Sequence, residues 1–257
     1  MSRALAVVNQ KGGVGKTTTS VNLAAALAKS GSRVLLVDLD PQGNATMGSG
    51  VDKRALTRTV YHVLLGLSEV SAVRARVERG GYDLLPANRE LAGAEIELVD
   101  LPRRETRLRE ALERVSDEYD FVLIDCPPSL SLLTVNALTA AQRVLIPMQC
   151  EYYALEGLSD LVATIKRVRA NLNPSLEIAG LLRTMYDPRN TLSQQVSQQL
   201  EQHFGDKVYR TLVPRNVRLA EAPSYGVPAV LWDAASKGAQ AYLALAAEIL
   251  AQGRQPA

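Results

Sequence analysis

Short apolar runs alternate along the chain with longer segments in which apolar residues recur at helical spacing. The apolar runs occupy residues 4–8, 33–38, 82–85, 121–125, 143–147 and 176–182. Runs of this length are typical of parallel strands that are buried on both faces of a sheet. Helical spacing occurs at residues 17–30, 105–115, 132–140, 155–170 and 239–250. This alternation predicts an α/β fold with a doubly wound, mostly parallel sheet and helices on both faces.

The pattern shows no boundary between two domains. The 257 residues contain no internal repeat, low-complexity block or Gly/Ser/Pro-rich linker. We therefore expect one domain over residues 1–252 and a short polar tail over residues 253–257. Gly31 directly follows the first helical segment, and a glycine at that position is suited to end a helix.

Composition and charge exclude several classes of protein. Hydrophobic residues make up 47% of the chain, which is enough for a large core, and the formal net charge is only +2. A nucleic-acid-binding surface would therefore have to be a local patch of charge. No apolar run is long enough to cross a bilayer, and the first strand follows Met1 too closely for a signal peptide. We expect a cytoplasmic protein. Cys126 and Cys150 lack CxxC or zinc-type spacing, and we expect both to be buried in the core.

The strongest chemical signal is the glycine-rich loop between the first strand and the first helix. Its glycines allow backbone N–H groups to close around phosphate oxygens, and the positive end of the following helix adds to that attraction. Lys16 is expected to reach the terminal phosphates, and the Thr17 hydroxyl is expected to bind magnesium. The predicted nucleotide-binding residues of this loop are Gly12, Gly13, Val14, Gly15, Lys16, Thr17 and Thr18, and the role of Lys11 depends on the later motifs.

The loop departs from the standard phosphate-binding pattern at two positions. Gln10 stands where that pattern has glycine, and Lys11 is a second lysine that the pattern does not require. Considered alone, Lys11 is better explained as a solvated charge in a loop. The motifs further along the chain decide between the two interpretations.

Three carboxylates follow predicted strands. Asp38 and Asp40 lie at the end of the second apolar run, and Asp125 ends the run FVLID. Ligands of such folds bind at the carboxyl ends of the strands. We expect Asp38 and Asp125 to support magnesium through water and Asp40 to orient the attacking water; Asp125 has the form of a Walker B acid. The plainer interpretation of residues 38–44 is a turn, because Asp, Pro, Gly and Asn are turn formers.

KGGVGKTT, VDLDPQGNAT and IDCPPSL together resemble the deviant Walker A ATPases of the ParA/MinD group. Two later runs, QCEYYALEGL (149–158) and VPRNVRLAEAPSYG (213–226), resemble the chromosomal ParA proteins called Soj. The resemblance covers almost the whole chain. It implies that Lys11 reaches the nucleotide of a partner subunit in a face-to-face ATP sandwich dimer. It also implies that Asp40 is needed for hydrolysis and that Pro214 and Asn216 lie near the adenine.

A basic segment raises the question of DNA binding. Residues 207–218 contain four basic residues and no acidic one, and Arg189 lies in the loop 186–190. On composition alone, a solvated surface is the plainer interpretation. The resemblance to Soj-like proteins places Arg189 and Arg218 on a DNA-binding face, and Arg215 lies in the same basic segment. Without a recognition helix we expect contacts to phosphates that do not depend on sequence.

The resemblance therefore implies a partition ATPase with ATP and Mg²⁺ as cofactors. It is expected to dimerise with ATP, to coat double-stranded nucleoid DNA, and to be released when a ParB-type (Spo0J-like) centromere-binding protein stimulates its weak hydrolysis. The chain begins almost at its first strand, so an operator-binding helix-turn-helix region is not expected.

Three alternatives use the same loop. A MinD-like cell-division regulator would need a basic amphipathic C-terminal helix, whereas residues 239–250 carry only Glu248 as a charge. An ATP-dependent small-molecule synthetase would need a substrate pocket, which no motif marks. A carrier of an iron–sulfur cluster, such as the nitrogenase iron protein, would need cluster cysteines, and neither Cys126 nor Cys150 has a glycine-flanked ligand context.

Overall fold

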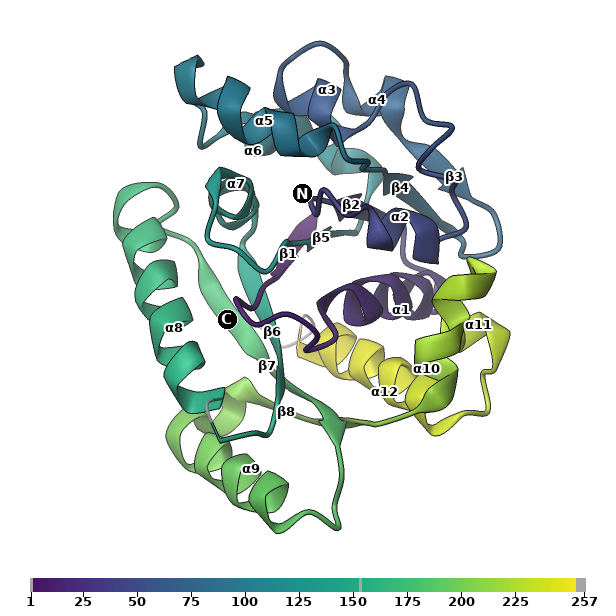
Figure 1. Cartoon of the computed structure of the whole chain (residues 1–257), viewed down its shortest axis with the longest axis vertical. Coiled ribbons are helices and arrows are strands. Elements are labelled where there is room, and N and C mark those ends of the chain that lie inside the picture. The colour runs from purple at the N-terminus through teal and green to yellow at the C-terminus, as the bar shows by residue number, and fades with distance from the viewer. Residues whose placement is uncertain (1, 153, 253–257) are drawn as a thin grey trace.

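The computed structural model describes residues 2–152 and 154–252, and the expected polar tail lies outside them. Its strands form one eight-stranded sheet in the order β3-β4-β2-β5-β1-β6-β7-β8 (Figure 1). The strands are β1 (Arg3–Val7), β2 (Val34–Asp38), β3 (Ala75–Val77), β4 (Tyr82–Leu85), β5 (Phe121–Asp125), β6 (Arg143–Gln149), β7 (Glu177–Tyr186) and β8 (Val208–Pro214). Pairing is parallel throughout except between β3 and β4. The predicted fold class is confirmed.

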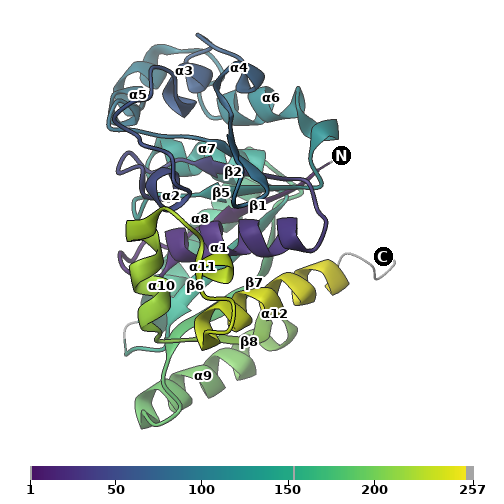
Figure 2. The ribbon, with the colours of Figure 1, turned by 90° about the vertical axis from the view of Figure 1, so that its right-hand side faces the viewer.

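Helices cover both faces of the sheet (Figures 1 and 2). The α-helices are α1 (Lys16–Lys29), α2 (Asn44–Gly48), α3 (Val60–Leu64), α4 (Val70–Val73), α5 (Leu91–Glu97), α6 (Arg107–Glu113), α7 (Leu132–Ala140), α8 (Ala154–Asn171), α9 (Thr191–Phe204), α10 (Val217–Glu221), α11 (Ala229–Trp232) and α12 (Lys237–Gln252). Short 3₁₀ turns are η1 (Leu98–Asp100), η2 (Ser116–Glu118), η3 (Gly205–Lys207) and η4 (Ala222–Tyr225). Helices α1 and α12 pack side by side on one face, whereas α7 and α8 cover the other.

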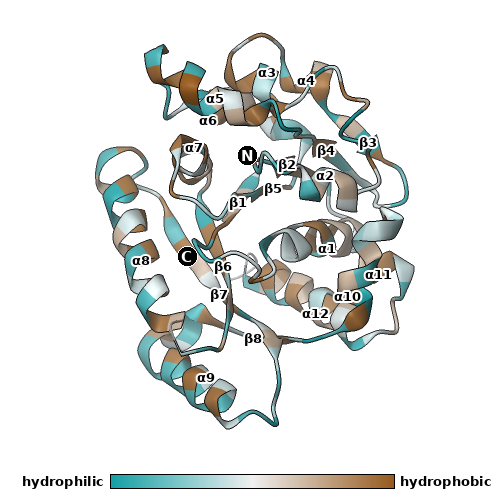
Figure 3. Cartoon of the chain, in the orientation of Figure 1, coloured by the Kyte–Doolittle hydropathy of each residue, from teal (hydrophilic) through white to brown (hydrophobic). Residues whose placement is uncertain are grey.

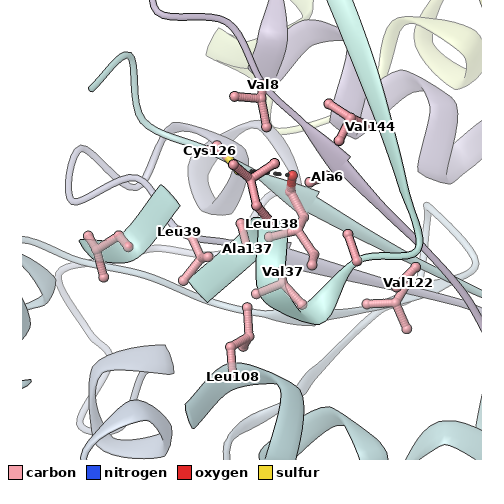
Figure 4. Close-up of a cluster of buried hydrophobic side chains, with 14 of the residues drawn as sticks. Ala6, Val8, Val37, Leu39, Leu108, Val122, Cys126, Ala137, Leu138 and Val144 are labelled. Carbon is pink, nitrogen blue, oxygen red and sulfur yellow. Dashed lines mark hydrogen bonds between the residues drawn. The ribbon is translucent and has the colours of Figure 1, made fainter. Parts of the chain in front are cut away.

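The core has two layers because the strands bury both of their faces. In β1, Ala4 and Ala6 belong to one buried cluster and Leu5 and Val7 to the other. Figure 4 shows part of the first cluster, where Cys126 lies beside Val8 and the helix α7. Cys126 and Cys150 are both buried, as expected. Helices α8 and α9 each carry both hydrophobic and hydrophilic residues, as expected of helices with one buried face (Figure 3).

The central strands end together at one edge of the sheet. Val7 of β1 and Asp38 of β2 are both register partners of Asp125 in β5. This edge therefore gathers the phosphate loop (residues 10–18), which follows β1, and the acids that end β2 and β5. At the other end of α1, Gly31 has φ +89°, a left-handed conformation that glycine adopts without strain. None of the helices in the described part of the chain is both long enough and apolar enough to span a membrane.

Candidate nucleotide and magnesium site

The phosphate loop joins β1 to α1 and depends on glycine for its shape. Gly13 and Gly15 have φ values of +73° and +89°, and Gly15 is the residue directly before α1. Side chains with a Cβ are strained in this region, whereas glycine is not. The loop thus turns sharply and presents the N-terminus of α1 at the sheet edge, which is the arrangement that binds phosphate in many proteins.

Lys16 is the first residue of α1 and lies inside the loop. Its side chain is buried, and its Nζ donates a hydrogen bond to the carbonyl oxygen of Lys11 at 3.1 Å. Burial lowers the pKa of Lys16, and the nearby Asp125 carboxylate opposes that effect. The ammonium is therefore placed within the curve of the loop, where a phosphate oxygen can replace the carbonyl as its partner.

Asp125 is held by two hydroxyls of α1. Thr17 Oγ1 donates to its Oδ2 and Ser20 Oγ donates to its Oδ1, both at 2.8 Å. The carboxyl is completely buried, and this burial, with the charge of Asp38 adding to it, raises its pKa to about 7. Ser20 was not predicted. Its position one helical turn after Thr17, on the same face of α1, is the signal that could have identified it.

Asp38 is also completely buried, and its main partner is Thr46 in α2. Its Oδ2 accepts hydrogen bonds from Thr46 N at 2.8 Å and from Thr46 Oγ1 at 2.7 Å. Burial raises the pKa of Asp38 to about 6. The same Thr46 hydroxyl accepts from Ala87 N at 2.9 Å, after β4. Thr46 was not predicted as a site residue, although it is the threonine of the GNAT run.

Asp40 lies in a turn two residues after the buried Asp38. Its Oδ1 accepts from Gln42 N at 2.9 Å, and its carbonyl oxygen accepts from Gly43 N at 2.8 Å. The residue is only 8% exposed. Asp40 therefore stabilises a turn, at the edge where the phosphate loop and Asp38 meet. Its role in orienting the attacking water stays a prediction.

Lys11 does not place its side chain in its own loop. The ammonium forms an ion pair with Glu151, which follows β6, and both side chains are about half exposed, at 50% and 48%. The Lys11 backbone N–H donates to Asn9 Oδ1 at 2.9 Å. Asn9 Nδ2 in turn donates to Pro147 O at 2.8 Å, so the loop is fastened to β6. These contacts direct the Lys11 side chain towards the rim of the site.

The end of β7 borders the loop on its other side, and β8 follows next in the sheet. Thr184 Oγ1 in β7 donates to Val14 O at 2.8 Å. Pro214 ends β8 and is the register partner of Tyr186 in β7. Asn216 caps α10, where its Oδ1 accepts from Leu219 N at 3.3 Å. The predicted adenine residues therefore lie at the end of β8 and just after it, and their contact with adenine stays a prediction.

The residues of the site suit magnesium. The Thr17 hydroxyl and the carboxylates of Asp38 and Asp125 are hard oxygen donors, and Mg²⁺ prefers such donors together with water and phosphate oxygens. In the described ranges, no group of three or more His, Cys, Asp or Glu side chains forms an all-protein metal cage. These donors fit a Mg²⁺ ion whose remaining coordination positions are filled by oxygens of a bound nucleotide.

The predicted DNA-binding arginines differ in how they are paired. Arg189 forms an ion pair with Asp187 at 3.0 Å. Arg215 is exposed and has no ion pair with any described residue. Hydrogen bonds from Arg189 and, to a smaller extent, the charge of Arg215 lower the pKa of Asp187 to about 2. Both arginines therefore lie near one carboxylate.

Arg218 lies in a more crowded setting. Its guanidinium pairs with Glu221 at 3.1 Å and with Asp233 at 3.2 Å, and its Cζ lies 5.5 Å from the ring centroid of Trp232. The ring of Trp232 in turn stacks on the ring of Tyr225. Arg218 is therefore less available to an external phosphate than Arg215.

Helix α12 turns its apolar face inward. Its buried residues include Tyr242, Leu245 and Ile249. Glu248, its one acidic residue, accepts hydrogen bonds from the backbone N–H groups of Arg210 and Thr211 in β8 at 2.9 and 3.0 Å. This helix is packed into the fold along its length.

Comparison with known proteins assigns the chain to a family. A family model described as an AAA domain matches residues 2–178. The sporulation initiation inhibitor protein Soj of Bacillus subtilis (strain 168) is 54% identical over 253 residues, which cover 98% of this chain and 100% of that protein. The chromosome partitioning protein ParA of Caulobacter vibrioides (strain NA1000 / CB15N) is 54% identical over 254 residues, which cover 98% of this chain and 95% of that protein.

A solved structure is similar over the whole chain. The cobyrinic acid a,c-diamide synthase from Mycobacterium smegmatis, with bound ATP analog and magnesium, has 42% sequence identity and a TM-score of 0.88. The match covers 99% of this chain and 97% of that one.

Proposed function

The chain belongs to the ParA/Soj family of chromosome-partitioning ATPases, and from that premise we propose how its own residues bind and hydrolyse ATP and how this drives assembly. It is an ATPase with ATP and Mg²⁺ as cofactors. The observation that carries the proposal is the connected cluster of Lys16, Thr17 and Asp125 behind a glycine loop at the carboxyl edge of the sheet.

We assign the phosphates to the loop and the N-terminus of α1. Lys16 exchanges the Lys11 carbonyl for a phosphate oxygen, and Thr17 turns its hydroxyl from Asp125 to the metal. When bound, Mg²⁺ supplies positive charge to the phosphate oxygens. Asp38 and Asp125 would hold the ion through water, and burial fixes the positions of both carboxyl groups. The backbone groups of Gly12, Gly13, Val14, Gly15 and Thr18 complete the phosphate contacts.

Hydrolysis needs a positioned water and added positive charge. We assign the water to Asp40, which lies at the edge of the site in a turn fixed by Gln42 and Gly43. The charge comes from Lys11 of a second subunit, acting as an arginine finger does in other NTPases. The outward position of Lys11 supports this role, because its ammonium is at the rim of the site and half exposed.

A lysine that reaches from one subunit into the other links ATP binding to dimerisation. A subunit that holds ATP can receive Lys11 only from another subunit, so ATP binding and dimerisation become coupled equilibria. We propose that residues 1–252 act as one such ATPase domain, since a single sheet runs from Arg3 to Pro214. Pro214 and Asn216 are assigned to the adenine.

We further propose that the dimer binds double-stranded DNA without sequence preference, through Arg189, Arg215 and Arg218. The proximity of Arg189 and Arg215 to one carboxylate supports a shared phosphate-binding face. A ParB-type centromere-binding protein then stimulates hydrolysis and releases the dimer, which associates the protein with the nucleoid. A MinD-like membrane role is disfavoured because the apolar face of α12 is already buried.

The similarity to a cobyrinic acid a,c-diamide synthase keeps an ATP-dependent synthetase as the second candidate. The two functions differ in what accelerates ATP turnover. We would measure phosphate release with DNA, with DNA plus the cognate ParB-type protein, and with cobyrinic acid plus glutamine as amide donor. Stimulation by DNA and the partner protein supports partition, whereas stimulation by the small acid alone would assign the second function.

A further inference from the structure

A second cavity lies at the opposite edge of the sheet from the phosphate loop. It encloses about 400 Å³, and its lining includes Arg3, Phe121, Gln142, Arg143, Tyr209 and Ile249. Strand β1 separates the two places, because it begins at Arg3 beside this cavity and ends at Val7 before the loop. The cavity is therefore distinct from the candidate nucleotide site, and its volume lies within the range of small-molecule pockets.

Tyr209 reaches this cavity from β8 by crossing β7 at Gly180. A Cβ added to Gly180 would lie 2.6 Å from Cε2 of the Tyr209 ring, so only glycine leaves room for the ring there. The tyrosine is 2% exposed, and its hydroxyl is buried without a hydrogen-bond partner in the described part of the chain. A buried hydroxyl that lacks a partner is costly, so such a group calls for an explanation.

Among the charged groups near Tyr209, Glu248 and Arg143 act on its pKa. Glu248 is already engaged, because its carboxylate accepts from the Arg210 and Thr211 backbone N–H groups. Burial raises the pKa of Tyr209, which keeps the phenol protonated and able to donate. Arg143, on the cavity side, carries only donors and cannot accept the hydrogen bond that the phenol can donate.

The cavity is lined by donors and by apolar groups. Arg3 and Arg143 both border it, no Asp or Glu is among its described lining residues, and neither arginine has an ion pair with another described residue. The Arg3 guanidinium lies 5.1 Å from the Phe121 ring centroid. Gln142 Oε1 accepts from Ala4 N, which leaves its NH₂ group as a further donor.

We propose that this cavity binds a small amphipathic anion, whose carboxylate or phosphate group faces Arg143, Arg3 and the Tyr209 hydroxyl. Charged groups of this kind pair strongly with guanidinium, and a phenol O–H adds a neutral donor. The apolar body of the ligand packs against Phe121 and Ile249, which form the hydrophobic walls. The exposed side chain of Arg143 donates to the anionic group. An oxygen of that group is the acceptor that the Tyr209 hydroxyl lacks.

Titration calorimetry of the full chain tests the proposal with four eight-carbon probes. Octanoate and octyl phosphate compare the two anionic head groups, and 1-octanol and octylamine replace the anion by a neutral or cationic group. We expect an anion to bind with a Kd below about 1 mM, within the reach of a ligand of about ten non-hydrogen atoms. Saturating MgADP should leave this Kd unchanged, because the nucleotide loop lies at the other end of β1.

Two variants locate the binding. Arg143→Gln and Tyr209→Phe should each weaken binding of the anion at least fivefold, while Arg54→Gln, in an exposed loop, serves as the control. Tyr209→Phe keeps the ring over Gly180 and removes a hydroxyl without a partner, so the midpoint of thermal unfolding without ligand should not fall. Equal binding of 1-octanol, unchanged affinity in both variants, or no binding of either anion would overturn the proposal.

Discussion

Lys11 forms an ion pair with Glu151 of the same subunit, at the rim of the phosphate loop. Both side chains are about half exposed, and ion pairs in such surroundings contribute little, about 0–1 kcal/mol. The contact therefore orients Lys11 without holding it firmly. The lysine can leave Glu151 for a stronger partner, such as a triphosphate.

Glu151→Gln should change the free energy of unfolding by less than about 1 kcal/mol, because it removes only an exposed ion pair. Urea denaturation followed by far-UV circular dichroism measures this change. Arg218→Gln is a useful comparison, since it removes two ion pairs and a ring contact. A loss of several kcal/mol in Glu151→Gln would mean that the pair holds the loop itself together.

The nucleotide-free protein should become less stable as the pH rises from about 5 to 8. Burial raises the pKa of Asp38 to about 6 and of Asp125 to about 7. A carboxyl whose pKa is raised in the folded state favours folding while it is protonated, and that contribution is lost as the pH rises through the raised pKa. The loss should reach at least about 1 kcal/mol, since one pKa unit corresponds to about 1.4 kcal/mol.

Denaturation at several pH values measures this effect, and Asp125→Asn should flatten the dependence because the side chain no longer ionises. MgATP should also flatten it, since bound cation favours the charged carboxylates. Stability that rises over the same pH range would contradict the assignment of these acids.

Asp40→Ala should retain ATP binding and lose most of the ATP turnover. Its carboxylate accepts one backbone hydrogen bond, from Gln42 N, so the fold should tolerate the change. Removal of a group that positions a reactant typically costs about 100-fold or more in rate. Phosphate release in the presence of DNA and the partner protein tests this, with Asp52→Ala in the next loop as the control. Normal turnover would assign the water to another residue.

Arg215→Ala should weaken DNA binding at low salt and reduce the slope of log K against log salt by about one unit, because one phosphate contact is lost. Arg218→Ala should have the smaller effect, since Arg218 is already paired with Glu221 and Asp233. Fluorescence anisotropy with duplexes of two unrelated sequences measures both. Arg79→Ala, between β3 and β4, is the control. An unchanged slope in Arg215→Ala would remove this residue from the DNA-binding face.

Sequence predicts the central part of this fold well. Strand β5 and helix α7 have the bounds expected from the pattern, because a continuous apolar run in a central strand leaves little ambiguity. The edge strand β8 was not predicted. Its exposed positions, such as Arg210, gave residues 208–214 the character of a basic surface segment, and only pairing with β7 makes it a strand.

The residues of the candidate site also differ in how well the sequence predicts them. Lys16, Thr17 and Asp125 belong to motifs with fixed spacing, so the sequence indicates their chemistry directly. Ser20 contacts Asp125 and could have been identified only from the helix face that it shares with Thr17. Thr46 carries no such signal, and only the fold brings its hydroxyl against Asp38. The sequence also does not predict the ion pair between Arg218 and Asp233, because only tertiary packing brings these two side chains together.

The central claim is that Lys11 joins two subunits through ATP. Sedimentation velocity of Asp40→Ala with saturating MgATP tests it most directly, because slow hydrolysis preserves the nucleotide. We expect a dimer with ATP, a monomer with ADP, and a monomer with ATP when Lys11→Ala is added, although the double variant still binds ATP. A double variant that dimerises like Asp40→Ala, or an Asp40→Ala protein that stays monomeric at high concentration with ATP bound, would contradict the account.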